Sequence, residues 1–213
     1  MKATELKIFA IDFEGNGREG ILEVGAICLH GGELSEPLDG FCACSRESGI
    51  FLSHRKIPLE RTAAGEPFNG FLPHLQAMRR RGILAAHHAS TEDALLRRHC
   101  PSPGFVPDWL NSGRSHATWG PWLDSRAAAR KIWPGRSSYG LGETLHGLGL
   151  RARWQELAAR LCPPDRRSPH CALYDAIGCA LLLDRCLRES GIGPLDLLRL
   201  LTGELQLRLA GIP

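Results

Sequence analysis

Two carboxylates stand one residue apart near the start of the chain, directly after an apolar run. The stretch AIDFEGNG, residues 10–17, contains Asp12 and Glu14. Because strand side chains alternate between faces, both carboxylates are expected on one face. Two ionised acids this close repel each other unless a cation lies between them. Oxygen ligands favour Mg²⁺ or Mn²⁺, so the stretch predicts a divalent-cation site at a strand end. The competing interpretation is a pair of solvated acids in a turn.

A second pair of acids, Glu92 and Asp93, follows a short apolar strand and opens a helix. Ser90 is expected to cap that helix, and acids in a first turn are also favoured by the helix dipole. Either acid is therefore a candidate ligand, with ordinary helix stabilisation as the alternative.

The third candidate is SPHCALYDAIGCALLL, residues 168–183. Asp175 interrupts an apolar helix face, where a carboxylate needs a partner or a metal. His170 precedes the helix, and the positive end of the helix dipole disfavours an imidazolium there. We therefore expect a neutral imidazole that can act as a base. The alternative is an exposed histidine in a loop and an aspartate bonded to a neighbouring turn.

The elements that position these residues follow from hydrophobic periodicity and from glycine and proline breaks. Three strands joined by short turns predict an antiparallel meander, and the strand and helix units after it predict an α/β layout with a mixed sheet and helices on both faces. The expected strands cover residues 6–13, 21–29, 38–44, 83–87 and 118–124. The expected helices cover residues 67–81, 90–99, 125–133, 139–150, 171–189 and 194–210, and a polar loop covers 163–169.

Composition indicates an ordinary globular protein. The chain has 213 residues, 43% hydrophobic and 23% charged, with a net charge of +3. It has neither an apolar stretch of signal-peptide length at the start nor one long enough to span a membrane, so we expect a cytoplasmic protein without membrane contact. The eight cysteines form no C-x-x-C pair, which argues against a zinc ribbon. Cys171, Cys179 and Cys186 are expected in the core, and Cys42 with Cys44 is a weaker metal candidate.

Taken in chain order, three segments resemble the motifs of the DEDDh 3′–5′ exonucleases, a family of the ribonuclease H-like fold. The first is FAIDFEGNGREGILEVGAI, with an apolar strand ending in D-x-E and a second acidic strand. The second is HHASTE, residues 87–92, which is similar to H-N-A-x-F-D. The third is the H-x-x-x-x-D spacing from His170 to Asp175, and the stretch from 122 to 150 resembles the family's linking segment. The family includes polymerase proofreading subunits, ribonuclease T and oligoribonuclease-like enzymes.

The resemblance implies a mixed five-stranded sheet, with a three-strand antiparallel meander plus two parallel strands. The resemblance covers roughly residues 6–188, so we expect an exonuclease domain over 1–190. The glycine and proline break at 191–194 then predicts a helical extension over 191–213, packed on the same domain. The resemblance also implies removal of nucleoside 5′-monophosphates from 3′ ends of single-stranded DNA or RNA, with association with a polymerase and a role in DNA repair or proofreading as options. The sequence carries no signal for an oligomeric state.

The implied chemistry uses two Mg²⁺ or Mn²⁺ ions. The metal ligands would be Asp12, Glu14, Glu92 and Asp175, with Asp12 bridging both ions and His170 as the general base. Three residue choices depart from the family's pattern: Glu92 replaces aspartate, His88 replaces asparagine, and Gly15-Asn16-Gly17 replaces a threonine-containing turn. Asp93 is the substitute ligand if the helix start shifts. The competing hypothesis is a non-catalytic relative that binds nucleic acid or a polymerase subunit.

Overall fold

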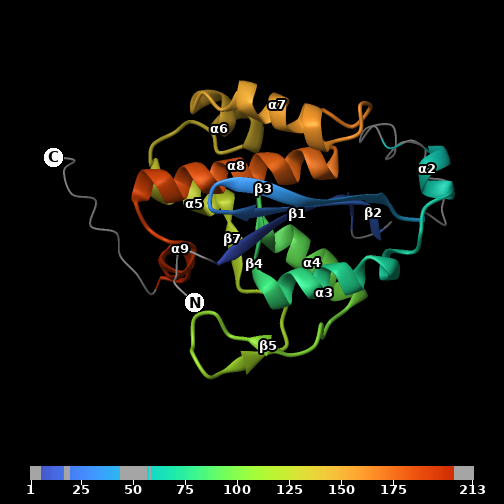
Figure 1. Cartoon of the computed structure of the whole chain (residues 1–213), viewed down its shortest axis with the longest axis horizontal. Coiled ribbons are helices and arrows are strands. Elements are labelled where there is room, and N and C mark those ends of the chain that lie inside the picture. The colour runs from blue at the N-terminus through green and yellow to red at the C-terminus, as the bar shows by residue number, and fades with distance from the viewer. Residues whose placement is uncertain (1–5, 17–19, 44–56, 58, 204–213) are drawn as a thin grey trace.

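A five-stranded mixed sheet forms the centre of the protein, with strand order β3-β2-β1-β4-β7 (Figure 1). The computed structural model describes residues 6–16, 20–43, 57 and 59–203. The first three strands form an antiparallel meander, and β4 and β7 run parallel to β1. The strands are β1 (Lys7–Asn16), β2 (Gly20–His30), β3 (Glu33–Phe41), β4 (Gly82–Ala86) and β7 (Trp122–Asp124). The predicted mixed sheet is confirmed.

Helices cover both faces of this sheet (Figure 1). On one face α8 lies against β1 and β2 with α5 beside it, and α6 and α7 form an outer layer on α8. On the other face α3 and α4 pack against β1 and β4. The helices are α2 (Leu59–Ala63), η2 (Phe68–Gly70), α3 (Leu72–Arg81), α4 (Ala89–His99), α5 (Ser125–Ile132), α6 (Leu141–Gly147), α7 (Arg151–Leu161), α8 (Ala172–Ser190) and α9 (Pro194–Thr202).

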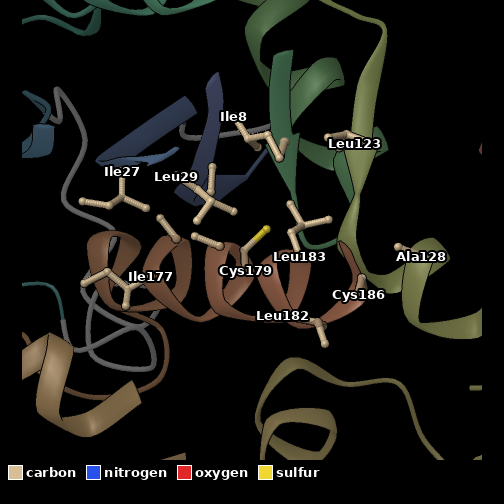
Figure 2. Packing of buried hydrophobic residues seen from close by; sticks show 14 of the residues in the cluster. Ile8, Ile27, Leu29, Leu123, Ala128, Ile177, Cys179, Leu182, Leu183 and Cys186 are labelled. Carbon is tan, nitrogen blue, oxygen red and sulfur yellow. The ribbon is translucent and has the colours of Figure 1, made fainter. Parts of the chain in front are cut away.

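Two hydrophobic clusters, one on each face, follow from the alternation of side chains along β1. Ile8 and Ala10 belong to the cluster on the α8 face. Phe9 and Ile11 belong to the cluster beneath α3 and α4. Figure 2 shows Ile8, with side chains from β2 and β7, above the apolar side of α8. This alternation decides the direction of the carboxylates that follow on β1.

The structure departs from the sequence predictions at several element boundaries. The third strand begins at Glu33, earlier than expected. Helix α4 begins after His88, so Ser90 lies inside the helix and is not its cap. Helix α7 was not expected, although Trp154, Leu157 and Ala158 bury one side of it at helical spacing. Residues 204–210 of the last expected helix and Cys44 lie outside the described residues.

Arg79, the first of three consecutive arginines at the end of α3, has a structural role. Its side chain is 2% exposed and donates hydrogen bonds to the backbone carbonyls of Thr118, Gly104 and His116. It thereby holds the segment that contains β5 (Val106–Pro107) and β6 (Ser115–His116) against α3. Arg79 is therefore unavailable as a surface cation.

The remaining expectations have mixed outcomes. Cys171, Cys179 and Cys186 are buried free thiols, as predicted. In α9, Leu197 and Leu198 join the cluster on the α8 face, so this helix packs on the same core. The division into 1–190 and 191–213 stays a prediction. Among the described residues, no helix is long and apolar enough to cross a membrane.

Candidate active site

The candidate site lies where the parallel strands end. Asp12 and Glu14 follow Ala10 at intervals of two on β1, so they point to the α8 face. Because β4 and β7 run parallel to β1, their carboxyl ends meet the same edge of the sheet. Ligands of α/β proteins bind at this edge.

Gly25 allows α8 to approach the sheet at this edge. It pairs with Asp12 across β1 and β2. A Cβ atom on Gly25 would lie 2.1 Å from the backbone carbon of Ala172 and 2.1 Å from the backbone nitrogen of Leu173. Only a glycine fits such a close backbone approach. The first turn of α8, which carries Asp175, is thereby held against the strand pair that carries Asp12.

Three of the predicted residues form one cluster. Glu14, His170 and Asp175 each offer a ligand atom, and these atoms lie within 4.8 Å of one another. His170 Nδ1 lies 3.9 Å from Glu14 Oε1, and the His170 backbone N–H donates to Asp175 Oδ2 at 2.9 Å. Glu14 is buried, whereas the His170 side chain is 64% exposed. The cluster therefore has a buried acid at its base and an imidazole at its mouth.

Asp12 lies at the electrostatic centre of the acidic residues. Burial raises its pKa well above the ordinary value, and the charges of Asp175, Glu14, Glu92 and Glu23 raise it further, in that order. Four acids near one carboxylate make a site of high negative potential. Such a site favours a cation or bound protons.

Glu92, rather than its neighbour Asp93, faces this site. Asp93 accepts a hydrogen bond from Trp122 Nε1 at 3.0 Å and pairs with Arg97 at 2.5 Å. Glu92 is 5% exposed, and its Oε2 has no hydrogen-bond partner within the described part of the chain. Burial raises its pKa to about 8, with contributions from the charges of Asp124 and Glu14. A buried carboxylate oxygen without a partner is costly unless it coordinates a cation.

The raised pKa of Glu92 predicts a pH dependence of stability in the metal-free protein. Between about 4.5 and about 8 the folded chain keeps a proton on Glu92 that the unfolded chain has lost. The free energy of unfolding therefore falls as pH rises through this window. In EDTA we expect the melting temperature to drop by roughly 5–10 °C from pH 5 to pH 8.5, and Glu92→Gln should flatten the drop. An unchanged slope in that variant would contradict the assignment of the buried proton.

Two histidines with left-handed backbones mark the starts of the helices that carry these acids. His88, at the start of α4, has φ +94°, and His170, just before α8, has φ +66°. A non-glycine residue in this region costs on the order of 1 kcal/mol. Strained residues persist where surrounding contacts hold them, and they are common at functional sites.

Asp124 and His87 join the elements behind the site. The two carboxylate oxygens of Asp124 accept from the backbone N–H groups of Ala89 and Ala127, both at 2.9 Å, so one residue holds the starts of α4 and α5. Asp124 is the N-cap of α5. Burial lowers the pKa of His87 to about 4, and its ring bonds Ser125 Oγ and the Tyr139 carbonyl. His87 is therefore a neutral cross-link and does not reach the carboxylates.

A buried ion pair, absent from the sequence predictions, underlies the loop before His170. Glu23 lies opposite Glu14 on β2, and Arg166 Nε donates to its Oε1 at 3.2 Å while Nη2 contacts Oε2. The two residues are 0% and 1% exposed. Burial raises the pKa of Glu23, and the guanidinium of Arg166 opposes that rise. Arg166 is thus a buried anchor and is not available at the surface as a cation.

No protein-family model matches the chain, and no curated protein matches it. Its structure is similar to solved structures of exonucleases. Exonuclease X in complex with 5′-overhanging duplex DNA has a TM-score of 0.63 and 21% identity, over 90% of this chain and 99% of its own. A 3′-exonuclease that recognises the 3′ end of a histone mRNA stem-loop has a TM-score of 0.63 and 17% identity, over 87% and 83%.

A third similar structure is E. coli exonuclease I in complex with a dT13 oligonucleotide. It has a TM-score of 0.57 and 12% identity, over 88% of this chain and 43% of its own. At these identities the likeness establishes the fold. The chain therefore has the ribonuclease H-like fold that these exonucleases share, and the resemblance drawn from the sequence motifs is confirmed at the level of the fold.

Proposed function

We propose that this chain is a divalent-metal-dependent 3′–5′ exonuclease that acts on single-stranded nucleic acid. The observation that carries the proposal is the meeting of Asp12, Glu14, Glu92 and Asp175 with His170 at the carboxyl edge of an exonuclease-like sheet. Structural proteins rarely gather unbalanced buried acids in this way, because each raises the pKa of the others.

The donor set fits divalent cations. Its atoms are carboxylate oxygens, which are the ligands that Mg²⁺ and Mn²⁺ prefer. The buried Glu92 Oε2 without a partner and the mutual repulsion around Asp12 are the features that a cation would relieve. We assign Asp12, Glu14, Glu92 and Asp175 as the ligands. When bound, a pair of such cations supplies Lewis-acid activation of water and neutralises charge that develops on the phosphate.

We assign His170 as the general base. Because Nδ1 faces the Glu14 carboxylate, Nε2 is the ring nitrogen left to accept a proton from the attacking water. The exposure of the side chain and its place in a short loop let it reach a phosphate at the mouth of the site. The hydrogen bond from its backbone to Asp175 fixes that loop to the acid cluster.

The test is digestion of matched DNA and RNA oligonucleotides, labelled at the 3′ or the 5′ end, with Mg²⁺, with Mn²⁺ and with EDTA. We expect cation-dependent, stepwise loss from 3′ ends that yields nucleoside 5′-monophosphates. His170→Ala should lower kcat by roughly a hundredfold or more, the usual worth of a general base.

The matched control is His74→Ala, because His74 is an exposed histidine on α3. This variant should retain wild-type turnover. Binding of oligonucleotides without turnover under every cation condition would instead favour the non-catalytic relative.

A further inference from the structure

A second hollow adjoins the candidate active site behind the loop that carries His170. It has a volume of about 460 Å³ and lies between α6, α7 and the first turn of α8. We call it the α6–α7 cleft, and its lining includes His146, Arg151, Trp154, Arg167, Pro169 and Tyr174. Its volume lies within the range of ligand pockets, roughly 300–1,000 Å³.

The cleft is close to the acid cluster along the chain. Pro169 directly precedes His170, and Tyr174 directly precedes Asp175. Arg167 lies three residues before His170, a separation of at most about 11 Å between backbone positions. A single strand with its 3′ end at the carboxylates therefore needs only a short further length to reach the cleft.

The lining of the cleft carries a net positive charge, because it holds two arginines, Arg151 and Arg167, and one acid. Within the part of the chain that the structure describes, Arg151 has neither a hydrogen bond nor an ion pair. Arg167 uses only its Nε in a hydrogen bond within the described residues, and this atom donates to the Cys162 carbonyl at 3.1 Å. The one acid on the rim, Glu143, accepts a hydrogen bond from Ser138. The free donors of the two arginines are suited to phosphate oxygens.

The floor of the cleft adds an unpartnered polar group. Tyr174 is 5% exposed, and its hydroxyl makes no hydrogen bond among the described residues. Its ring stacks on Trp154 at a centroid distance of 4.2 Å, and Trp154 Nε1 donates to the Tyr174 carbonyl at 2.8 Å. Because the two rings are buried against each other, they do not offer an open face to a base. The donors of the cleft therefore suit the sugar-phosphate backbone, which all sequences share.

We propose that the α6–α7 cleft binds an internal phosphate of the strand whose 3′ end occupies the acid cluster. This inference rests on the proposed function for its substrate. It predicts that longer strands bind more tightly than dinucleotides, because only longer strands fill both places.

The test compares Arg151→Gln with Arg160→Gln. Both arginines are exposed residues of α7 with no hydrogen bond within the described residues, but Arg160 lines a different hollow, against α8 and the β2–β3 turn. KM and kcat are measured on oligo(dT) and oligo(U) of two and eight nucleotides. In Arg151→Gln we expect KM for the octamer to rise roughly five- to tenfold, because one charge-assisted contact is lost. KM for the dinucleotide should stay unchanged, so the difference in KM between the two lengths should become smaller.

A salt series gives a second readout. The slope of log affinity for the octamer against log salt concentration should become shallower by about 0.7 in Arg151→Gln, as one phosphate contact is lost. Arg160→Gln should keep the wild-type slope and the wild-type length dependence. Equal effects of Arg151→Gln and Arg160→Gln would overturn the proposal. An equal rise in KM for the dinucleotide and the octamer would also overturn it.

Failure of this inference is separable from failure of the proposed function. Fluorescence anisotropy with labelled octamer in EDTA measures binding without turnover. If the wild-type chain cleaves and Arg151→Gln binds the octamer as tightly as wild type, the proposal of phosphate binding in the cleft is overturned and the proposed exonuclease activity stands. If the wild-type chain binds the octamer without cleaving it, and Arg151→Gln but not Arg160→Gln weakens this binding, the phosphate site in the cleft is supported and the proposed exonuclease activity is overturned. A wild-type chain that neither binds nor cleaves would overturn both.

Discussion

Asp12→Asn is expected to lower exonuclease turnover by roughly three orders of magnitude while leaving the fold intact. Asparagine has nearly the same shape as aspartate, so the β1–β2 pairing and the approach of α8 at Gly25 should survive. What the substitution removes is the charge at the centre of the acid cluster, where Asp175, Glu14 and Glu92 act on one carboxylate.

The same substitution should raise thermal stability in EDTA. The pKa of Asp12 is raised because its ionised form is buried among other acids. Asparagine removes this charge and its repulsion with the neighbouring acids, so the free energy of unfolding should increase. Mn²⁺ should raise the melting temperature of the wild-type chain, and this rise should shrink in the variant. If turnover falls while the melting temperature rises, the loss of activity cannot be due to unfolding of the variant.

The control for this prediction is Asp196→Asn, which makes the same chemical change on α9. Asp196 is partly exposed and pairs with Arg199 at 3.1 Å. It should retain turnover, and its melting temperature should shift little, because exposed pairs contribute at most about 1 kcal/mol. Wild-type turnover in Asp12→Asn would contradict the proposed site.

Arg166→Ala is expected to lower the free energy of unfolding by about 3–5 kcal/mol. The reason is that Glu23 would remain fully buried beside Glu14 without its cation. The loss should also loosen the segment between α7 and His170, so kcat should fall in the folded fraction as well. Urea denaturation measures the first effect, and single-turnover digestion measures the second.

Two comparisons make this prediction specific. Arg167→Ala removes the neighbouring exposed arginine and should cost less than about 1 kcal/mol. The double variant Glu23→Leu with Arg166→Met replaces the pair with apolar side chains and should recover much of the stability, because no buried charge is then left alone. A loss in Arg166→Ala no larger than in Arg167→Ala would show that the buried pair is not an anchor.

The sequence by itself determined the elements whose signals are local. Alternation along residues 7–16 defined both faces of β1, and the acids at its end were readable because they interrupt an apolar run. The apolar repeat of α8 likewise exposed Asp175 as an anomaly. The order of the motifs then sufficed to predict the mixed five-stranded sheet. Helix α7 was also readable in principle, since its apolar spacing is helical.

The tertiary structure decided matters that depend on partners far apart in the chain. Glu92 and Asp93 are equivalent in a sequence, and only the position of Trp122 and Arg97 shows that Asp93 is engaged elsewhere. Glu23 and Arg166 are 143 positions apart in the sequence, so their pairing is likewise not readable from it. Burial and neighbouring charge set the pKa of a carboxylate and the use of an arginine, and both are properties of the folded surroundings. Local periodicity can place a residue on one face of a strand or helix. It cannot identify the side chains from distant segments that pack against that face.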